Sequence, residues 1–292
     1  MIAGDLLRSV ITLIAEGVGC DLVVADPPWP GQFFRYSTAW EDDPNSIDSG
    51  TSAADLDQSE RDWLRFMRPR LEAFRLLLRD TGVLVLTSEH RNLFRVGQLV
   101  DEIFGVRNRL TVLGWAKQYA YGGRVGTTYD YLIVVARDRA RWLEGPGRTA
   151  SLDPPQWWTA HEVGEVTLDA SVPGYRTAGI NELTRIIGPD HRFFAAKPSS
   201  LYKRIISGWC PRDGSVIDPF AGSGAAGHAV LDLNAEGADR RFILIDEAHD
   251  TLDGPAIARH VSAERVRRVI SGEWSAGDHA SRPGAFSFEL LR

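Results

Sequence analysis

The stretch DPFAGSGAAG, residues 218–227, decides the fold class of this 292-residue chain. It ends an apolar run at 214–220 that predicts a strand, and it opens a predicted helix. Glycines at such a turn let the backbone come close to a ligand at the N-terminus of a helix. The stretch therefore predicts a ligand-binding turn in an α/β fold.

The spacing of Gly222, Gly224 and Gly227 matches the dinucleotide fingerprint, and Asp246 ends the next predicted strand, where a ribose-binding acid belongs. This indicates an adenosine-type cofactor, either NAD or S-adenosylmethionine. A tight turn without a ligand is the alternative. A dinucleotide fold needs several βα units after this turn, whereas only about 65 residues follow it here. The position of the stretch therefore favours S-adenosylmethionine.

Further apolar runs alternate with helical spacing and predict a mainly parallel sheet. The predicted strands are 2–5, 20–26, 81–88, 109–116, 129–136, 214–220 and 240–246. A helix is expected over 59–79, capped at Ser59, because one apolar face is formed by Trp63, Met67, Leu71, Phe74 and Leu78. Residues 30–58 are rich in Gly, Ser, Asp and Pro and predict a loop.

The tetrapeptide Asp26-Pro27-Pro28-Trp29 ends the predicted strand 20–26. Ligands of open α/β sheets bind at the carboxyl ends of strands, so Asp26 should meet Asp218, Asp246 and Asp5 there. The exocyclic amino group of a nucleobase is a poor nucleophile. The Asp26 carboxylate and the Pro27 carbonyl can accept hydrogen bonds from its two N–H groups. Trp29 can stack on a nucleobase that has been flipped out of a nucleic-acid double helix. The alternative is a proline-rich turn with no ligand.

These two motifs resemble the signatures of amino-group DNA methyltransferases. Their order is similar to the β class, and more closely to the modification subunits of type III restriction systems. The resemblance covers most of the chain, including IAGDLL (2–7), DEIFG (101–105), the strand with Trp115 and Lys117, TTYDYLIVVARD (127–138), AAKPSSLYKRI (195–205) and FILID (242–246). It implies an α/β, circularly permuted, Rossmann-like S-adenosylmethionine-dependent methyltransferase sheet with a small inserted recognition region.

The resemblance also implies functions for individual residues. Catalysis would fall to Asp26, Pro27, Pro28 and Trp29. The cofactor S-adenosylmethionine would be held by Asp5, Lys197, Pro198, Ser200, Asp218, Pro219, Phe220, Gly222, Ser223, Gly224 and Asp246. An aspartate as first residue of the tetrapeptide is typical of N6-adenine enzymes. Methylation of the N4 amino group of cytosine in DNA, or of an amino group in RNA, is an alternative. An inactive cofactor- or DNA-binding relative is another, since Ala225 and Ala226 stand where the family often has threonine.

The resemblance predicts three regions: a catalytic half at 1–137, a short target-recognition insertion at 138–192, and a cofactor-binding half with a C-terminal tail at 193–292. The insertion combines arginines with aromatic residues, which suits DNA contacts, although a solvated cover with inward tryptophans has the same composition. It is shorter than in type III subunits. Either the sequence specificity is therefore relaxed, or a homodimer mate or a restriction subunit supplies further DNA contacts.

Composition excludes several other classes. The net charge of −6 is concentrated in residues 41–62, which hold eight acids against Arg61, so the remainder is nearly neutral and can still bind DNA. The two cysteines, Cys20 and Cys210, form no zinc-ligand spacing, so no metal is expected, and they favour a reducing cytoplasm. No stretch of about 18 apolar residues occurs, so no membrane span is expected. DEAH at 246–249 matches a helicase box, but no phosphate-binding loop with its lysine precedes it.

Overall fold

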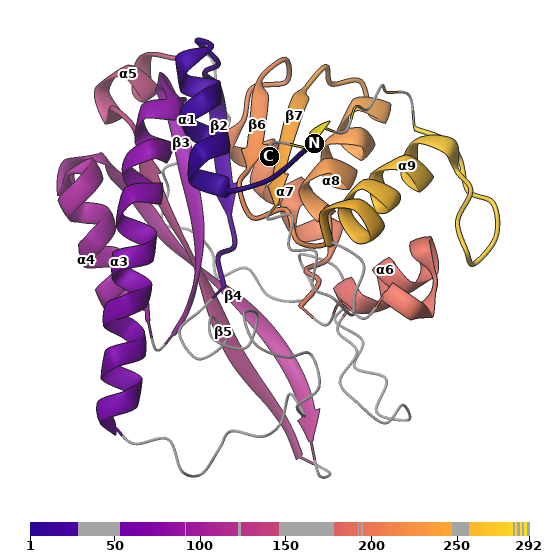
Figure 1. Cartoon of the computed structure of the whole chain (residues 1–292), viewed down its shortest axis with the longest axis horizontal. Helices are drawn as coiled ribbons and strands as arrows, with labels where there is room; N and C mark the ends of the chain where they lie inside the picture. Colours follow the sequence, from indigo (N-terminus) through magenta and orange to yellow (C-terminus); the bar gives the residue numbers. More distant parts are fainter. Residues whose placement is uncertain are drawn as a thin grey trace.

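The chain folds around one mixed sheet of eight strands in the order β4-β5-β3-β2-β6-β7-β1-β8 (Figure 1). The structure is a computed structural model, and it describes residues 1–28, 53–90, 92–121, 124–145, 178–191, 193, 195–246, 257–282, 284, 287 and 289–290. The strands are β1 (Ile2–Ala3), β2 (Cys20–Ala25), β3 (Leu78–Glu89), β4 (Arg109–Tyr121), β5 (Arg124–Ala136), β6 (Ser215–Asp218), β7 (Arg241–Asp246) and β8 (Glu289–Leu290).

Parallel pairing dominates this sheet, as the apolar runs predict. β2 lies between β3 and β6, parallel to both, and β7 pairs in parallel with β6 and with β1. β5 runs antiparallel to β3 and to β4. The strand with the DPPW motif and the strand with the glycine loop are therefore direct neighbours in the middle of the sheet, and their carboxyl ends lie at the same edge.

Helices cover both faces of the sheet (Figure 1). On one face lie α1 (Leu6–Ala15), α3 (Ala53–Leu77) and α4 (Leu93–Phe104), which share one buried apolar cluster with alternate residues of β2 and β3. On the other face lie α5 (Arg139–Glu144), α7 (Ser199–Trp209), α8 (Ala225–Ala235) and α9 (Glu264–Ser271), which share a second cluster. The structure also has short 3-10 helices at Val106–Asn108 and Pro189–His191 and a π-helical turn at Ala258–Ala263.

Several predicted boundaries are wrong. The helix expected over 59–79 spans Ala53–Leu77, so Ser59 lies inside it rather than at its cap, and part of the predicted loop 30–58 is helical. Leu78 is the first residue of β3. Of the five residues predicted for one apolar face, the first four are buried on α3. Helical spacing found the face but not its ends, because packing against the sheet decides where the helix stops.

Two further strand predictions need correction. β4 and β5 form a hairpin that pairs as far as Tyr121 and Arg124, well beyond the predicted ends at 116 and 129. β6 ends at Asp218 rather than 220, because Pro219 has no N–H for a strand ladder and the chain turns there. The remaining predicted strands occur within three residues of their expected ends, the largest difference being the start of β3 at Leu78 rather than 81.

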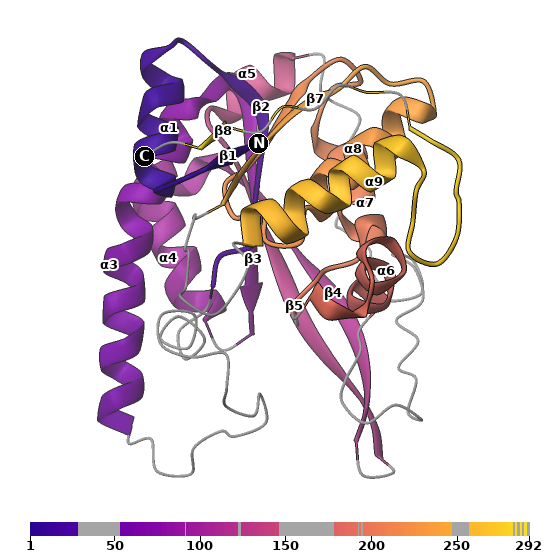
Figure 2. The same ribbon diagram turned by 45° about the vertical axis from the view of Figure 1, so that its right-hand side comes forward.

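The predicted insertion 138–192 is described only at its two ends, and both ends pack on the main body. Trp142 of α5 is buried against Trp209 of α7, with ring centroids 5.9 Å apart. α6 (Ala178–Ile187) packs beside α9, and Arg268 donates to the carbonyl of Ile186 at 3.1 Å (Figure 2). The intervening residues 146–177, which include Arg148, Arg176 and three of the four aromatic residues predicted to contact DNA, lie outside the described residues.

Candidate active site

Three acidic side chains meet at the carboxyl edge of the sheet. Asp26 follows β2, Asp218 ends β6 and Asp246 ends β7. Burial raises the pKa of Asp218 well above its ordinary value; a hydrogen bond from the Phe220 N–H opposes this, and the charges of Asp26 and Asp246 raise it further. Asp218 is therefore close enough to both of the other predicted carboxyls for their charges to act on it, as expected from the strand ends.

Asp5 stands at the same edge, one strand farther on. β1 pairs with β7 so that Ala3 lies opposite Asp246, and the Gly4 N–H donates to the Asp246 carbonyl at 3.0 Å. The Asp5 carboxylate caps α1 by accepting from the N–H of Arg8 at 2.7 Å. Its predicted contact with the cofactor adenine stays a prediction.

The carboxylate of Asp26 is held from two sides. Thr87 of the neighbouring strand β3 donates its hydroxyl to Oδ1. Lys197 Nζ contacts Oδ2 at 2.5 Å, and both charged side chains are largely but not fully buried. Lys197, which the resemblance assigns to the cofactor, thus contacts Asp26 of the DPPW motif, in the predicted catalytic half.

The prolines of the tetrapeptide are fixed by a residue of α3. The indole N–H of Trp63 donates to the carbonyl of Pro28 at 2.5 Å. Pro27 is buried between Asp26 and this contact. The Pro28 carbonyl is thus engaged by the protein, and the Pro27 carbonyl stays the predicted acceptor. Trp29 lies outside the described residues.

The glycine loop has a backbone that side chains would disturb. Gly222 and Gly224 have φ values of +47° and +73°, and a Cβ at Gly224 would stand 2.9 Å from the carbonyl oxygen of Ser262. Pro219 and Ser223 are buried, and the Phe220 ring packs edge-on against Phe74 at 6.2 Å. Among the described residues, Asp218 Oδ2 is a buried oxygen without a hydrogen-bond donor. A close-approach loop beside acceptor oxygens suits the hydroxyl and amino groups of S-adenosylmethionine.

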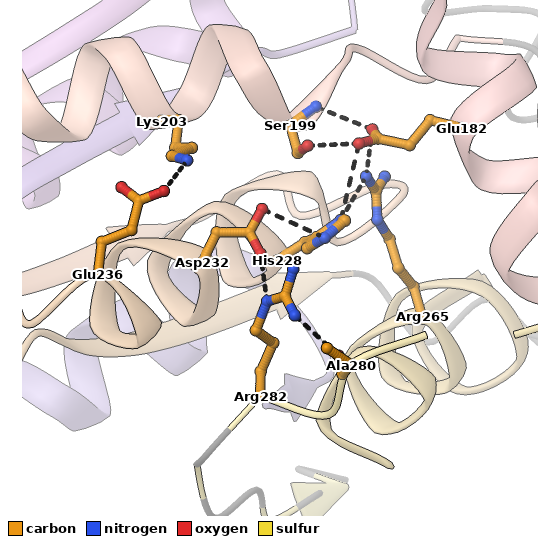
Figure 3. A network of polar contacts seen from close by, with 9 residues as sticks. All are labelled: Glu182, Ser199, Lys203, His228, Asp232, Glu236, Arg265, Ala280 and Arg282. Atoms are coloured by element: carbon orange, nitrogen blue, oxygen red, sulfur yellow. Dashed lines mark hydrogen bonds and ion pairs between the residues drawn. The ribbon is translucent and has the colours of Figure 1, made fainter. Parts of the chain in front are cut away.

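A buried polar network supports this loop from behind (Figure 3). Arg265 of α9, fully buried, pairs with Glu182 of α6 at 2.6 Å and contacts Ser223 Oγ at 3.3 Å. Glu182 accepts from both the N–H and the hydroxyl of Ser199, the first residue of α7. The glycine loop is therefore tied to the Lys197-Pro198 segment, which directly precedes α7, through one arginine and one glutamate.

The charges in this network are matched. Burial alone would raise the pKa of Glu182, but Arg265, His228 and the Ser199 donors outweigh it and hold that pKa below its ordinary value. His228 of α8 contacts Arg265 at 3.1 Å, and burial, reinforced by Arg265, lowers its pKa to about 4. His228 is thus neutral at pH 7 and can accept a hydrogen bond from the guanidinium.

Sequence reasoning missed five residues that shape the site. Thr87, Trp63, Glu182, His228 and Arg265 all contact a motif residue or the network behind it. None lies within a signature motif. Their contacts join positions 35 to 83 residues apart in the sequence, apart from the Glu182–Ser199 contact, which spans 17 residues. Of the remaining predicted site residues, Pro198 is buried before α7 and Ser200 lies on its first turn.

Comparison with known proteins gives relatives along most of the chain. The chain is 26% identical to the type III restriction-modification enzyme StyLTI Mod subunit of Salmonella typhimurium, covering 91% of this chain and 56% of that protein. It is 24% identical to the type II methyltransferase M2.MboI of Moraxella bovis, covering 80% of this chain and 78% of the relative. The chain therefore spans little more than half the length of the Salmonella subunit.

Solved structures share the fold. The M1.HpyAVI-SAM complex matches with a TM-score of 0.51 and 15% identity over 91% of this chain and 99% of that one. The PvuII DNA methyltransferase, which is cytosine-N4-specific, matches with a TM-score of 0.51 and 16% identity over 91% and 85%. These likenesses confirm the predicted α/β methyltransferase sheet, while its circular permutation stays a prediction.

A family model for DNA methylases, N6_N4_Mtase, matches residues 20–257, which include both motifs and every strand between them. This span is more than half of the chain. The chain belongs to the N6_N4_Mtase family of DNA methylases.

Proposed function

We propose that this DNA methylase transfers a methyl group from S-adenosylmethionine to the N6 amino nitrogen of adenine in DNA. The observation that carries the proposal is the position of Asp26. Its carboxylate is fixed at the carboxyl edge of the sheet, close to Asp218 and the glycine loop that follows it. An acceptor for the substrate amine therefore lies beside the loop proposed to hold the methyl donor.

The cofactor half supplies acceptors for S-adenosylmethionine. Asp246, at the end of β7, is proposed to bind the ribose hydroxyls, and Asp218 with the glycine loop to bind the amino-acid part. Phe220, Pro219 and Ser223 line this turn in the proposal, with Asp5 toward the adenine. When bound, the cofactor supplies an electrophilic methyl group on a sulfonium. The nearby carboxyls favour that positive charge.

The catalytic half handles the acceptor amine. The Asp26 carboxylate and the Pro27 carbonyl are proposed to accept hydrogen bonds from its two N–H groups. These bonds favour a tetrahedral nitrogen with an available lone pair. Trp29 is proposed to stack on the extruded base. Adenine is chosen because the tetrapeptide begins with Asp26, as is usual in N6-adenine relatives.

DNA is the proposed substrate, and its recognition is proposed to need a second chain. The Salmonella relative is named as a Mod subunit of a restriction-modification enzyme, and this chain spans 56% of its length. A second copy of this chain or a restriction subunit would extend the DNA-contacting surface. Sedimentation of the protein with and without DNA measures the stoichiometry and separates a dimer from a monomer. Among the described helices, none is long and apolar enough to cross a membrane, and the cytoplasmic location stays a prediction.

The test is tritiated methyl transfer to unmethylated genomic DNA, with the product base identified by mass spectrometry. We expect N6-methyladenine from the wild type. Asp26→Ala should lower kcat by about 100- to 1,000-fold, by analogy with a lost oxyanion-hole donor, and leave the Kd for S-adenosylmethionine nearly unchanged.

Asp213→Ala is the matched control, because that carboxylate is exposed at the opposite edge of the sheet, before β6. It should keep full activity. N4-methylcytosine as product would overturn the choice of adenine, and transfer to RNA alone would overturn the choice of DNA. Cofactor binding without transfer to any nucleic acid would favour an inactive relative.

A further inference from the structure

We propose that Lys197 is a positioning residue for the Asp26 carboxylate, set in place by the cofactor half of the protein. The inference rests on the proposed methyl transfer, because it assigns Asp26 the substrate amine. It goes beyond the motif-derived view of Lys197 as a cofactor contact, since the ammonium contacts the catalytic motif.

The first support is the geometry around Asp26. Lys197 Nζ lies 2.5 Å from Oδ2, while the Thr87 hydroxyl donates to Oδ1. Donors on both oxygens fix the rotation of the carboxyl group. A carboxylate offers about four lone-pair sites, so two donors still leave acceptor capacity on each oxygen. Lys197 and Thr87 can thus orient Asp26 while its carboxylate still accepts a hydrogen bond from the substrate amine.

The second support is the charge at this edge of the sheet. Asp218 lies close enough to both Asp26 and Asp246 for their negative charges to act on it. Like charges repel at such distances, and an opposite charge in contact offsets that repulsion. Lys197 brings a positive charge directly onto Asp26, the carboxylate that must stay an acceptor during the proposed reaction.

The third support is the anchoring of Lys197 itself. Two residues later, Ser199 donates its N–H to Glu182 at 2.9 Å and its hydroxyl to the same carboxylate. Glu182 pairs with Arg265 at 2.6 Å (Figure 3). Arg265 also contacts Ser223 of the glycine loop. The backbone that carries Lys197 is therefore fixed by the same network that supports the glycine loop.

The experiment compares Lys197→Met and Lys197→Arg with Lys203→Met. Lys203 is the matched control, because it lies on α7 and pairs with Glu236 on the surface. For Lys197→Met we expect kcat at saturating S-adenosylmethionine and DNA to fall about 10- to 100-fold, the size of a lost charged hydrogen bond. The Kd for S-adenosylmethionine, measured by calorimetry without DNA, should stay within about twofold. Lys197→Arg should recover part of kcat, since a guanidinium also donates to a carboxylate.

A thermal double-mutant cycle tests the contact without activity. The losses in Tm caused by Lys197→Met and Asp26→Asn should be non-additive, with the double variant losing less than their sum. Additive losses would overturn the proposal. An unchanged kcat in Lys197→Met would do so as well, and so would a weakened Kd with full kcat, which would make Lys197 a cofactor residue. Failure of the wild type to methylate DNA would instead remove the proposed function and, with it, the role of Asp26.

Discussion

The two sides of the candidate site are built differently. On the proposed acceptor side, Asp26 and Lys197 keep 15% and 20% of their side-chain surface exposed. On the cofactor side, Arg265 and His228 are 0% and 3% exposed and belong to a continuous polar network. A buried network gives one rigid arrangement, whereas an accessible carboxylate leaves room for an incoming base. The difference suits a preformed donor site and an acceptor site that must admit its substrate.

On the proposed cofactor side, the largest loss of stability is expected when Arg265 is replaced. Arg265→Met should destabilise the protein by about 3–5 kcal/mol, because it leaves Glu182 partly buried without its cation. Chemical denaturation measures this. Arg267→Met on the same helix removes an exposed ion pair with Glu264 and should cost at most about 1 kcal/mol. Equal losses in the two variants would contradict the contrast.

The next effect is a pH dependence set by His228. Its pKa is about 4 in the folded protein against the ordinary 6.5, so between these values the unfolded chain binds the proton and the folded chain does not. Stability should therefore fall as the pH is lowered through this range, by up to roughly 3 kcal/mol from this residue.

The raised pKa of Asp218 acts in the opposite direction, since the folded state then holds its proton longer. Asp218 contributes to the wild type and to the variants alike, so it cancels in the difference between them. His228→Gln should flatten the fall in unfolding free energy between pH 6.5 and 4. His260→Gln, at an exposed histidine, is the control and should leave the slope unchanged. If unfolding free energy fell with pH as steeply in His228→Gln as in the wild type, His228 would not be the cause of the pH dependence.

A smaller effect is expected at the half-buried Asp246. Asp246→Ala should weaken S-adenosylmethionine binding by about 1.5–3 kcal/mol, the range for hydrogen bonds to a charged group, and leave kcat at saturating cofactor largely intact. Calorimetry measures the affinity. Asp239→Ala, exposed at the other end of β7, is the matched control. Unchanged affinity in a folded Asp246→Ala variant would remove Asp246 from the site, and tight NAD binding by the wild type would revive the dehydrogenase alternative.

The smallest expected effect is a fall in kcat when the Thr87 hydroxyl on the proposed acceptor side is removed. Thr87→Val removes the hydroxyl that donates to Asp26 and keeps the shape of the side chain. We expect kcat to fall about tenfold, corresponding to roughly 1.4 kcal/mol for a lost charged hydrogen bond, with cofactor affinity unchanged. Thr12→Val, which removes a hydroxyl contact on the surface of α1, should have no effect on kcat. A fall in cofactor affinity without a fall in kcat would contradict the separation of the two sides.

The sequence by itself determined the architecture and the two motif positions. Apolar runs placed β2, β6 and β7, and acids at the ends of these runs predicted that Asp26, Asp218 and Asp246 converge, as they do. These signals are local. Strand periodicity, a proline turn and a glycine turn are each encoded within a few neighbouring residues.

The tertiary structure alone decided how the motifs are held. The bounds of α3 depend on packing against the sheet, and the long β4–β5 hairpin depends on cross-strand pairing. Thr87 reaches Asp26 across 61 residues of sequence, Lys197 across 171, and Arg265 reaches Glu182 across 83. No periodicity links such distant positions. Only the folded sheet brings them within hydrogen-bonding distance, so the supports of the site could be found only in three dimensions.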